Sequence, residues 1–286
     1  MSVLAHKIDF VVLVSVTNAN PNGDPLNGNR PRTTYTGNGE ISDVCIKRKL
    51  RNRLQDLGER IFVQSNERCD DGFNSLSDRA GKTITTYTSK DDYAAQACAT
   101  WFDVRAFGQV FAYKNSKDKG KDGVSVGVRG PVSIHQAISI SPVDINSMQI
   151  TKSVNGEPTD DGKKSSDTMG SKHLVEFGLY KIKGAINVQL AEKTGFTEED
   201  AEKIKECLRT LFINDSSSAR PDGSMEVVKL YWWKHQNKIG QYSSAKVHNA
   251  LQITQKDGVT YPKSAEDYTL TLTTLEGLEP EIIDGI

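Results

Sequence analysis

The sequence has 286 residues, of which 26% are charged and 36% hydrophobic, and its formal net charge at pH 7 is -1. This length predicts one large domain or two small ones, and the near-neutral charge excludes a surface that is basic throughout, so that any nucleic-acid contact must be a local patch. Four widely spaced cysteines without a CxxC pair do not indicate a zinc site or a disulfide framework, and the lack of long apolar runs or a signal-peptide pattern predicts a cytoplasmic protein with no membrane partner.

The first predicted element is a strand at residues 7–16, KIDFVVLVSV, which is apolar at nearly every position. Such a run is typical of a strand that is buried on both faces. Residues 18–32, NANPNGDPLNGNRPR, then combine three Pro, two Gly and five Asn, which is turn chemistry. Because loops this long in compact domains usually serve a function, we expect a functional loop that ends in Arg30 and Arg32.

A helix is predicted next, with Ser42 as its N-cap and Asp43 in its first turn. Apolar residues follow at helical spacing and predict the buried stripe of the helix. They are Ile46, Leu50, Leu54, Leu57 and Ile61.

The same helix carries a cluster of basic residues on both flanks of this stripe. They are Lys47, Arg48, Lys49, Arg51 and Arg53. Like charges at i and i+4, such as Lys47 and Arg51, destabilise a bare helix, and an anionic ligand would relieve that repulsion. A solvated basic face is the alternative; the neighbouring arginines of the loop favour phosphate binding.

The rest of the chain alternates polar segments with regular elements. A short helix is predicted near residues 91–102, a flexible loop at 114–123, a strand at 124–141 and a polar stretch at 151–173. A strand follows at 174–190, then a helix that begins at a capping box of Thr197 and Asp200, and a last strand at 226–235. The inner stripe of that helix is predicted to be Ala201, Ile204, Leu208 and Leu211. Without the insertions the order is strand–helix–strand–strand–helix–strand, as in the α+β ferredoxin-like or RRM fold.

Catalytic motifs are weak. The five histidines lack metal-binding spacing, and no P-loop, GxSxG or GxGxxG occurs. Asp24 is a candidate metal ligand or acid, although an Asp in such a position more often caps its own turn. Residues 105–112, RAFGQVFA, partly match the RNA-binding strand signature of RRM domains. We therefore expect no cofactor.

Five segments, taken in order, resemble one protein family. They are NPNGDP with the arginines that follow, SDVCIKRKLRN, FDVRAFGQVFA, GVRGPVSIHQAI and KHLVEFGLYKIKGAI. The sequence between about residue 8 and residue 235 resembles the backbone subunit of the CRISPR Cascade effector, subtype I-C. The resemblance implies sequence-independent binding of CRISPR guide RNA by a non-enzymatic subunit. Its partners would be copies of itself in a helical backbone, other Cascade subunits, and target DNA through the guide.

The family's architecture implies a modified RRM palm, inserted helical fingers and a β-hairpin thumb. The implied parts are 1–61 (palm), 62–123 (fingers), 124–144 (palm strand), 145–173 (thumb), 174–235 (palm) and 236–286 (C-terminal extension).

The resemblance also implies the residues that bind the guide. Lys47 and Arg51 match helix residues that grip phosphates, Arg30 or Arg32 matches a loop arginine, and 105–110 matches the segment along the bases. The implied RNA-binding residues are Asn22, Arg30, Arg32, Ser42, Lys47, Arg48, Arg51, Arg105, Phe107, Gly108, Gln109, Met169, Ser171, Lys172 and His173.

Two other functions stay open at this point. Related subunits of type III effectors cut target RNA with an Asp in the corresponding loop, which makes a metal-dependent ribonuclease acting through Asp24 the alternative. A self-assembling scaffold without RNA is the third possibility, and the basic helix argues against it.

Overall fold

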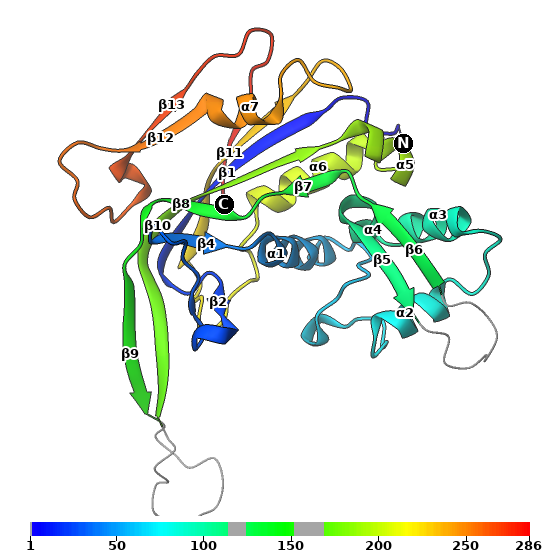
Figure 1. Ribbon diagram of the computed structural model, residues 1–286, viewed down its shortest axis with the longest axis horizontal. Helices are drawn as coiled ribbons and strands as arrows, with labels where there is room; N and C mark the ends of the chain where they lie inside the picture. Colours follow the sequence, from blue (N-terminus) through cyan, green and yellow to red (C-terminus); the bar gives the residue numbers. More distant parts are fainter. Residues whose placement is uncertain (1, 114–123, 152–168) are drawn as a thin grey trace, which may run out of the picture.

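The computed structural model describes residues 2–113, 124–151 and 169–286, and within them the chain builds one large antiparallel sheet (Figure 1). The predictions for residues 114–123 and for the polar tip at 152–168 lie outside the described residues. Six strands cross the sheet in the order β14 (Glu281–Asp284), β11 (Met225–Lys234), β1 (Ile8–Ala19), β10 (Met169–Ile186), β8 (Ala137–Pro142) and β4 (Asn38–Ile41). Two more, β7 (Val132–Ile134) and β9 (Ile145–Thr151), also pair with β10.

Strand β1 lies at the centre of the sheet, between β10 and β11. Its side chains alternate between the two faces, as the period of a strand requires. Phe10 and Val12 join the core under the helices, whereas Val11 and Leu13 join a second core on the opposite face. All four are fully buried, which confirms the prediction of a strand covered on both sides.

Three helices cover one face of the sheet: α1 (Asp43–Asp56), α5 (Val188–Thr194) and α6 (Glu198–Arg209). The order along the chain of β1, α1, β8, β10, α6 and β11 is the strand–helix–strand–strand–helix–strand order that the sequence predicts, and the mixed α+β class is confirmed. Both predicted caps are also confirmed. Ser42 Oγ accepts a hydrogen bond from the Cys45 amide at 3.2 Å, and Thr197 and Asp200 form the capping box.

The buried stripe of α1 is shorter than the sequence predicts. Ile46, Leu50 and Leu54 are buried, but Leu57 is 42% exposed. The helix ends at Asp56, and Gly58, with a left-handed φ of 85°, turns the chain away from the helix axis. The prediction for Leu57 is therefore wrong, because it assumed one more helical turn.

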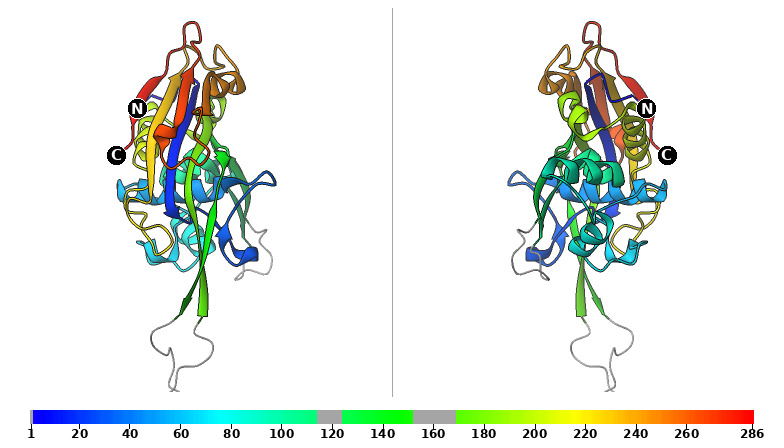
Figure 2. Two further views of the ribbon diagram at one scale, coloured as in Figure 1. Left: turned by 90° about the vertical axis from the view of Figure 1, so that its left-hand side faces the viewer. Right: turned by 90° about the vertical axis from the view of Figure 1, so that its right-hand side faces the viewer.

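The C-terminal segment covers the second face of the sheet (Figure 2). It consists of α7 (Ser244–Ala250), β12 (Leu251–Gln255), a 3-10 turn (Ala265–Asp267) and β13 (Tyr268–Leu272). Its side chains Val247, Leu251 and Tyr268 pack with Leu13 and Trp233 of the sheet. The sequence did not assign a role to 236–286, and the structure shows that this segment closes an apolar face.

An inserted unit between α1 and β7 has a core of its own. Its elements are a 3-10 turn (Asn66–Arg68), α2 (Leu76–Thr83), α3 (Lys90–Thr100), α4 (Phe102–Phe107), β5 (Gly108–Tyr113) and β6 (Val124–Arg129). Phe62 lies at the centre of the core, with ring centroids 4.7 Å from Trp101 and 5.1 Å from Phe111. The short helix predicted near 91–102 corresponds to α3 and the start of α4.

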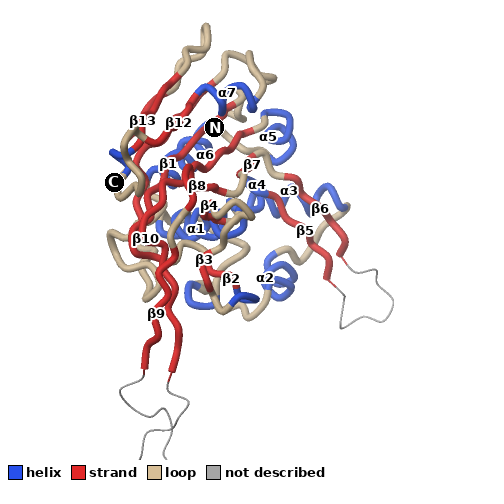
Figure 3. Tube along the Cα trace, turned by 60° about the vertical axis from the view of Figure 1, so that its left-hand side comes forward, coloured by secondary structure: helices blue, strands red, loops and turns tan. Residues whose placement is uncertain are grey.

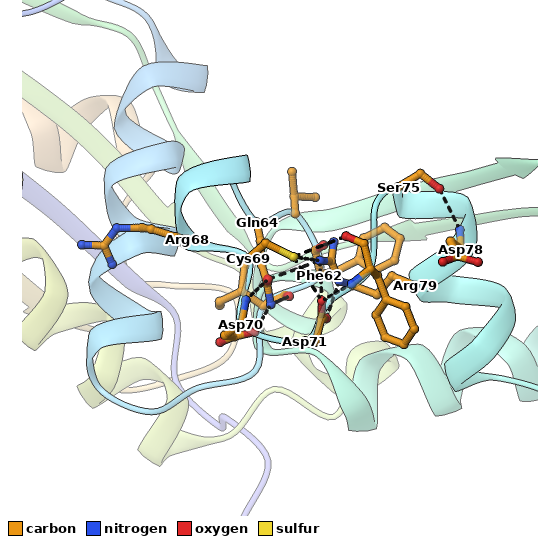
Figure 4. Close-up of polar contacts among 12 residues, drawn as sticks. Phe62, Gln64, Arg68, Cys69, Asp70, Asp71, Ser75, Asp78 and Arg79 are labelled. Carbon is orange, nitrogen blue, oxygen red and sulfur yellow. Dashed lines mark hydrogen bonds and ion pairs between the residues drawn. The ribbon is translucent and has the colours of Figure 1, made fainter.

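One buried arginine holds the loop that leads into this unit (Figure 4). Arg79 of α2 donates to both carboxylate oxygens of Asp71, at 2.6 and 2.8 Å, and to the carbonyl oxygen of Phe62 at 2.9 Å. The hydrogen bonds from Arg79 lower the pKa of Asp71 to about 2. The irregular chain between Phe62 and α2 is thus fixed by side-chain contacts in place of a regular element.

Residues 124–141 do not form the single strand that the sequence predicts. Strand β6 pairs only with β5, in a separate two-stranded sheet, while β7 and β8 belong to the main sheet. Gly130 and Pro131 separate β6 from β7 and interrupt the ladder, because proline has no amide hydrogen to donate. A Cβ at Gly130 would lie 2.3 Å from the carbonyl oxygen of Ala106, so the chain at this turn passes close to α4.

Strands β9 and β10 continue beyond the main sheet as a projecting two-stranded hairpin (Figure 3). The hairpin stands apart from the helices and from the C-terminal segment in the other views as well (Figure 2). Within the described part of the chain, no helix is both long enough and apolar enough to cross a lipid bilayer.

Candidate nucleic-acid interface

The loop after β1 folds into a small structure of its own. It contains β2 (Gly23–Asp24), a 3-10 turn (Pro25–Asn27) and β3 (Arg30–Pro31). Gly28 and Asn29 adopt left-handed backbone angles, with φ values of 57° and 58°, as the Asn- and Gly-rich sequence predicts.

The amide groups of this loop are largely used within it. The amides of Asn29 and Arg32 donate to the carbonyl oxygens of Asp24 and Asn22, at 2.8 and 3.0 Å, and the amide of Leu26 donates to the Asp24 carboxylate at 3.2 Å. These residues therefore do not present a cradle of free N–H groups to an anion. The capacity of the loop to hold an anion must come mainly from side chains.

Asn22 and Ser42 connect the loop to the start of α1. The Asn22 side-chain oxygen accepts from the Ser42 amide at 2.9 Å, and Ser42 in turn caps the helix. These two predicted site residues lie together, and both hold the loop in place.

Arg30 joins the loop to the root of the projecting hairpin. Its guanidinium donates to Ser147 Oγ at 2.8 Å and lies 3.4 Å from Nδ1 of His173. His173 and Ser147 are themselves 2.8 Å apart and lie opposite one another in the β9–β10 register. We call these three residues the loop–hairpin junction. Because a guanidinium only donates, Ser147 Oγ accepts from Arg30, and neither of the two partners is a carboxylate.

The hairpin presents two different faces beyond this junction. Ser147, Gln149, Ser171 and His173 occupy one face, because cross-strand partners in the register point to the same side. Met148 and Ile150, 40% and 48% exposed, lie on the other face with Lys172. Met169 is 66% exposed, and its sulfur accepts from Gln149 Nε2 at 3.0 Å. The polar face is the one that continues from Arg30.

The remaining loop arginine is partly neutralised. Arg32 lies 3.5 Å from the carboxylate of Asp24, and both side chains are about one-third exposed. Asp24 also caps the 3-10 turn, so its carboxylate performs the local role that is usual for an Asp in a turn. Among the described residues, no three histidine, cysteine, aspartate or glutamate side chains lie together as a metal site.

The basic residues of α1 are paired within the protein, contrary to the expectation of an unrelieved row of charges. Lys47 lies 3.2 Å from Asp43 on the surface, and Arg51 donates to the buried carboxylate of Asp103 at 2.8 Å. The other three contacts are from Arg48 to the carbonyl oxygen of Val63, from Lys49 to Asp215 and from Arg53 to Thr210. Lys49 is only 4% exposed, so the alternative of a solvated basic face is also wrong at that position.

The predicted segment 105–110 divides into two parts. Arg105 forms two 2.9 Å hydrogen bonds with the carboxylate of Asp200 and a third to the carbonyl oxygen of Cys98, which places it between the inserted unit and α6. The guanidinium of Arg51 lies over the ring of Phe107, with Cζ of Arg51 5.3 Å from the ring centroid. Gln109 donates to the carbonyl oxygen of Val110, whose side chain is 68% exposed.

Gly108 connects these two parts with a φ of 80°, and a Cβ there would lie 2.4 Å from the carbonyl oxygen of Val128. A residue with a side chain does not fit at this position.

Sequence comparison identifies the family. The profile described as "CRISPR-associated protein Cas7" matches residues 6–273, which is most of the chain. The chain belongs to the Cas7 family.

One curated protein and two solved structures are similar to this chain. A protein of Haloferax volcanii named "CRISPR-associated protein Cas7" is 25% identical over 296 residues, which cover 98% of this Cas7-family chain and 85% of that protein. A chain of a solved "CRISPR RNA-guided surveillance complex, pre-nicking" superimposes with a TM-score of 0.50 at 13% identity, covering 89% of this chain and 84% of that one. A chain of another "CRISPR RNA-guided surveillance complex" has a TM-score of 0.47 at 16% identity, covering 89% and 78%. The first superposition shows a shared fold.

The covered sheet face matters for where this family member could hold RNA. RRM domains stack bases on aromatic side chains of the sheet face. Here Tyr231 and Trp233 of the second face are buried against the C-terminal segment. This surface is therefore occupied, whereas the C-terminal segment does not cover the loop–hairpin side (Figure 2).

Proposed function

We propose that this chain binds CRISPR guide RNA, without reading its sequence, as the repeated backbone subunit of a type I Cascade effector of subtype I-C. Copies of the chain would line up along one guide with other Cascade subunits, and the guide would pair with target DNA. The sheet with its helices would be the palm, the inserted unit the fingers, and the β9–β10 hairpin the thumb. In this role the subunit is not an enzyme, because recognition is left to base pairing.

One observation carries the proposal: at the junction of the loop and the hairpin, Arg30 contacts a hydroxyl and an imidazole and not a carboxylate. Ser147 and His173 fix the position of the guanidinium, and among the described residues no carboxylate lies within ion-pair distance of it. Its charge remains available to a phosphate, which forms short charge-assisted hydrogen bonds with guanidinium groups. Phosphate contacts of this kind position RNA without selecting a sequence.

Two other cations lie near the junction. Lys172 directly precedes His173 in β10 but lies on the opposite face of the hairpin, where it would meet the guide from the other side. Among the described residues, Lys47 has only the surface pair with Asp43, which is worth little. We infer that Arg30, Arg32, Lys47 and Lys172 contact guide phosphates. Asn22 and Ser42 hold the loop. Met169, Ser171 and His173 supply further contacts along β10, and Gln109 supplies one from β5 of the inserted unit.

The test measures the salt dependence of guide-RNA binding. The test variant carries both Arg30→Ala and Lys172→Ala. The control variant carries both Arg209→Ala and Lys238→Ala, and it loses an arginine and a lysine from surface ion pairs with Glu206 and Glu192. Each lost phosphate contact lowers the log–log salt slope for a single strand by about 0.7, so we expect a reduction of about 1.4 in the first variant only. The loss should be equal for two guides of unrelated sequence. Equal slopes for the two double variants would remove the junction from the RNA site.

A second assay separates this function from the ribonuclease. Assembled complex is incubated with target RNA and Mg²⁺, with and without Asp24→Ala. We expect intact RNA in both, because Asp24 caps a turn and pairs with Arg32. Cuts at regular spacing that disappear in the variant would establish the ribonuclease instead.

A further inference from the structure

A cavity on the second face of the sheet has no part in the proposed RNA site. It has a volume of about 910 Å³ and lies between the ends of β1 and β8, the middle of β10, and the chain segment that links β12 to β13. Phe177, which lines it, packs with the core under the C-terminal segment, whereas the loop–hairpin junction lies on the side of the helices. A ligand of this cavity would therefore not compete directly with RNA at the junction.

Aromatic rings form much of the cavity lining. Phe177 is half-buried, Tyr268 is buried with its hydroxyl 3.2 Å from Ser141 Oγ, and Tyr261 is 70% exposed at the rim. A guanidinium or ammonium group is attracted to the face of such rings. The exposed ring of Tyr261 has the most to gain from a ligand that covers it.

Two carboxylates provide the charge of the cavity. Asp144 and Glu176 are both exposed, and the Glu176 amide donates to the Asp144 carbonyl oxygen at 3.0 Å, which holds the two residues side by side. Within the described ranges of the chain, neither carboxylate forms an ion pair. Lys263 is the single basic residue of the lining, so the carboxylates outnumber it.

The backbone next to the carboxylates is irregular. Asn18, which also lines the cavity, has a φ of 50°, although Thr17 and Ala19 on either side of it pair regularly with β10. Its amide side chain adds a hydrogen-bonding group to the acidic wall.

This chemistry selects between classes of ligand. Phosphates of a nucleic acid would be repelled by the two carboxylates, whereas a cationic side chain would meet both the carboxylates and the aromatic rings. A cavity of about 910 Å³ has room for several side chains and thus for a segment of a protein. We propose that the cavity is a docking site for a partner protein that inserts an arginine or lysine flanked by apolar residues.

The test uses the full chain in cells that make its native assembly. Tyr261→p-benzoylphenylalanine places a photo-crosslinking ring at the rim without altering a buried residue. We expect crosslinking to a protein peptide that carries arginine or lysine within three residues of the attachment point. The additional change Asp144→Asn with Glu176→Gln should lower the crosslinking yield about fivefold, since two exposed ion pairs are lost.

A charge-matched control keeps the result specific. Asp257→Asn with Glu266→Gln removes the same charge from exposed positions of the same segment that do not line the cavity, and it should leave the yield unchanged. Crosslinks to RNA or DNA, no crosslink at all, or equal losses in the two double variants would each overturn the proposal. Guide-RNA affinity measured on the same variants should not change, so a failure here leaves the proposed function standing.

Discussion

Arg30 and Arg105 were both expected to contact guide RNA, yet their surroundings differ. Arg30 is held by a hydroxyl and an imidazole, whereas Arg105 makes two hydrogen bonds to the carboxylate of Asp200, which is 6% exposed. Neutral partners fix an arginine without cancelling its charge. An acidic partner cancels the charge, and a phosphate would have to break that pair before it could bind. The comparison teaches that the partner of a cation, more than its exposure, decides whether the cation is available.

The largest effect is expected at Arg105. Arg105→Ala leaves the Asp200 carboxylate buried without its cation, which typically costs about 3 kcal/mol of unfolding free energy. Urea denaturation of the purified chain measures this loss, and Arg209→Ala, which breaks only an exposed pair with Glu206, should change the value by less than about 0.5 kcal/mol. If Arg105→Ala stays stable but no longer binds guide RNA, Arg105 contacts the RNA as Arg30 is proposed to do, and the contrast between the two arginines is wrong.

Arg51 tests the same distinction within helix α1. We expect Arg51→Ala to cost about 2 kcal/mol, because the Asp103 carboxylate keeps the amides of Phe62 and Val63 as donors after the guanidinium is gone. A double-mutant cycle with Asp103→Ala isolates the pair. The log–log salt slope of RNA binding should stay constant; a reduction by about 0.7 would show that Arg51 also contacts a phosphate.

The smallest effect is expected at Lys181, a buried cation whose hydrogen-bond partners are carbonyl groups and not carboxylates. Nζ donates to the carbonyl oxygens of His248 and Leu251 at 2.8 and 2.7 Å. Burial, together with repulsion from Lys183, lowers the pKa of Lys181 from 10.5 to about 8.

Between these two pKa values the unfolded chain binds more protons than the folded one, so this lysine makes stability rise with pH from about 8 to 10.5. Below pH 8 the lysine is protonated in both states, and its contribution no longer changes with pH. The stability difference between the native chain and Lys181→Met, followed by urea denaturation from pH 7.5 to 9.5, should grow in favour of the native chain. The exposed control Lys263→Met should show no such trend. A flat difference for Lys181→Met would mean that carbonyl partners suffice to keep the ammonium charged.

Local signals in the sequence predicted local structure well. The apolar run of β1, the N-cap at Ser42 and the capping box at Thr197 each depend on neighbours within a few residues, and all three are confirmed. The failures at Leu57 and at residues 124–141 arose where a glycine redirected the chain at a point that periodicity alone does not mark.

The availability of the basic residues could not be predicted, because their partners lie far away in the sequence. Lys49 pairs with Asp215, Arg51 with Asp103 and Arg105 with Asp200. The sequence alone does not distinguish a basic residue that binds an RNA phosphate from one that pairs with a carboxylate far away in the chain. Ser147 was missed as a residue of the junction for the same reason, although its place opposite His173 follows once the hairpin register is known.

The central place of β1 has a consequence for synthesis on the ribosome. Its two neighbours in the sheet, β10 and β11, are complete only at Ile186 and Lys234, so the most apolar strand is made first and must wait for both of its partners. At about 5 to 20 residues per second, the nascent chain exposes this strand for roughly 10 to 40 seconds. Long-range pairing of this kind folds slowly and leaves the strand open to aggregation in the meantime. We therefore expect yield in cells to depend on chaperone supply and translation speed more than on the stability of the finished fold.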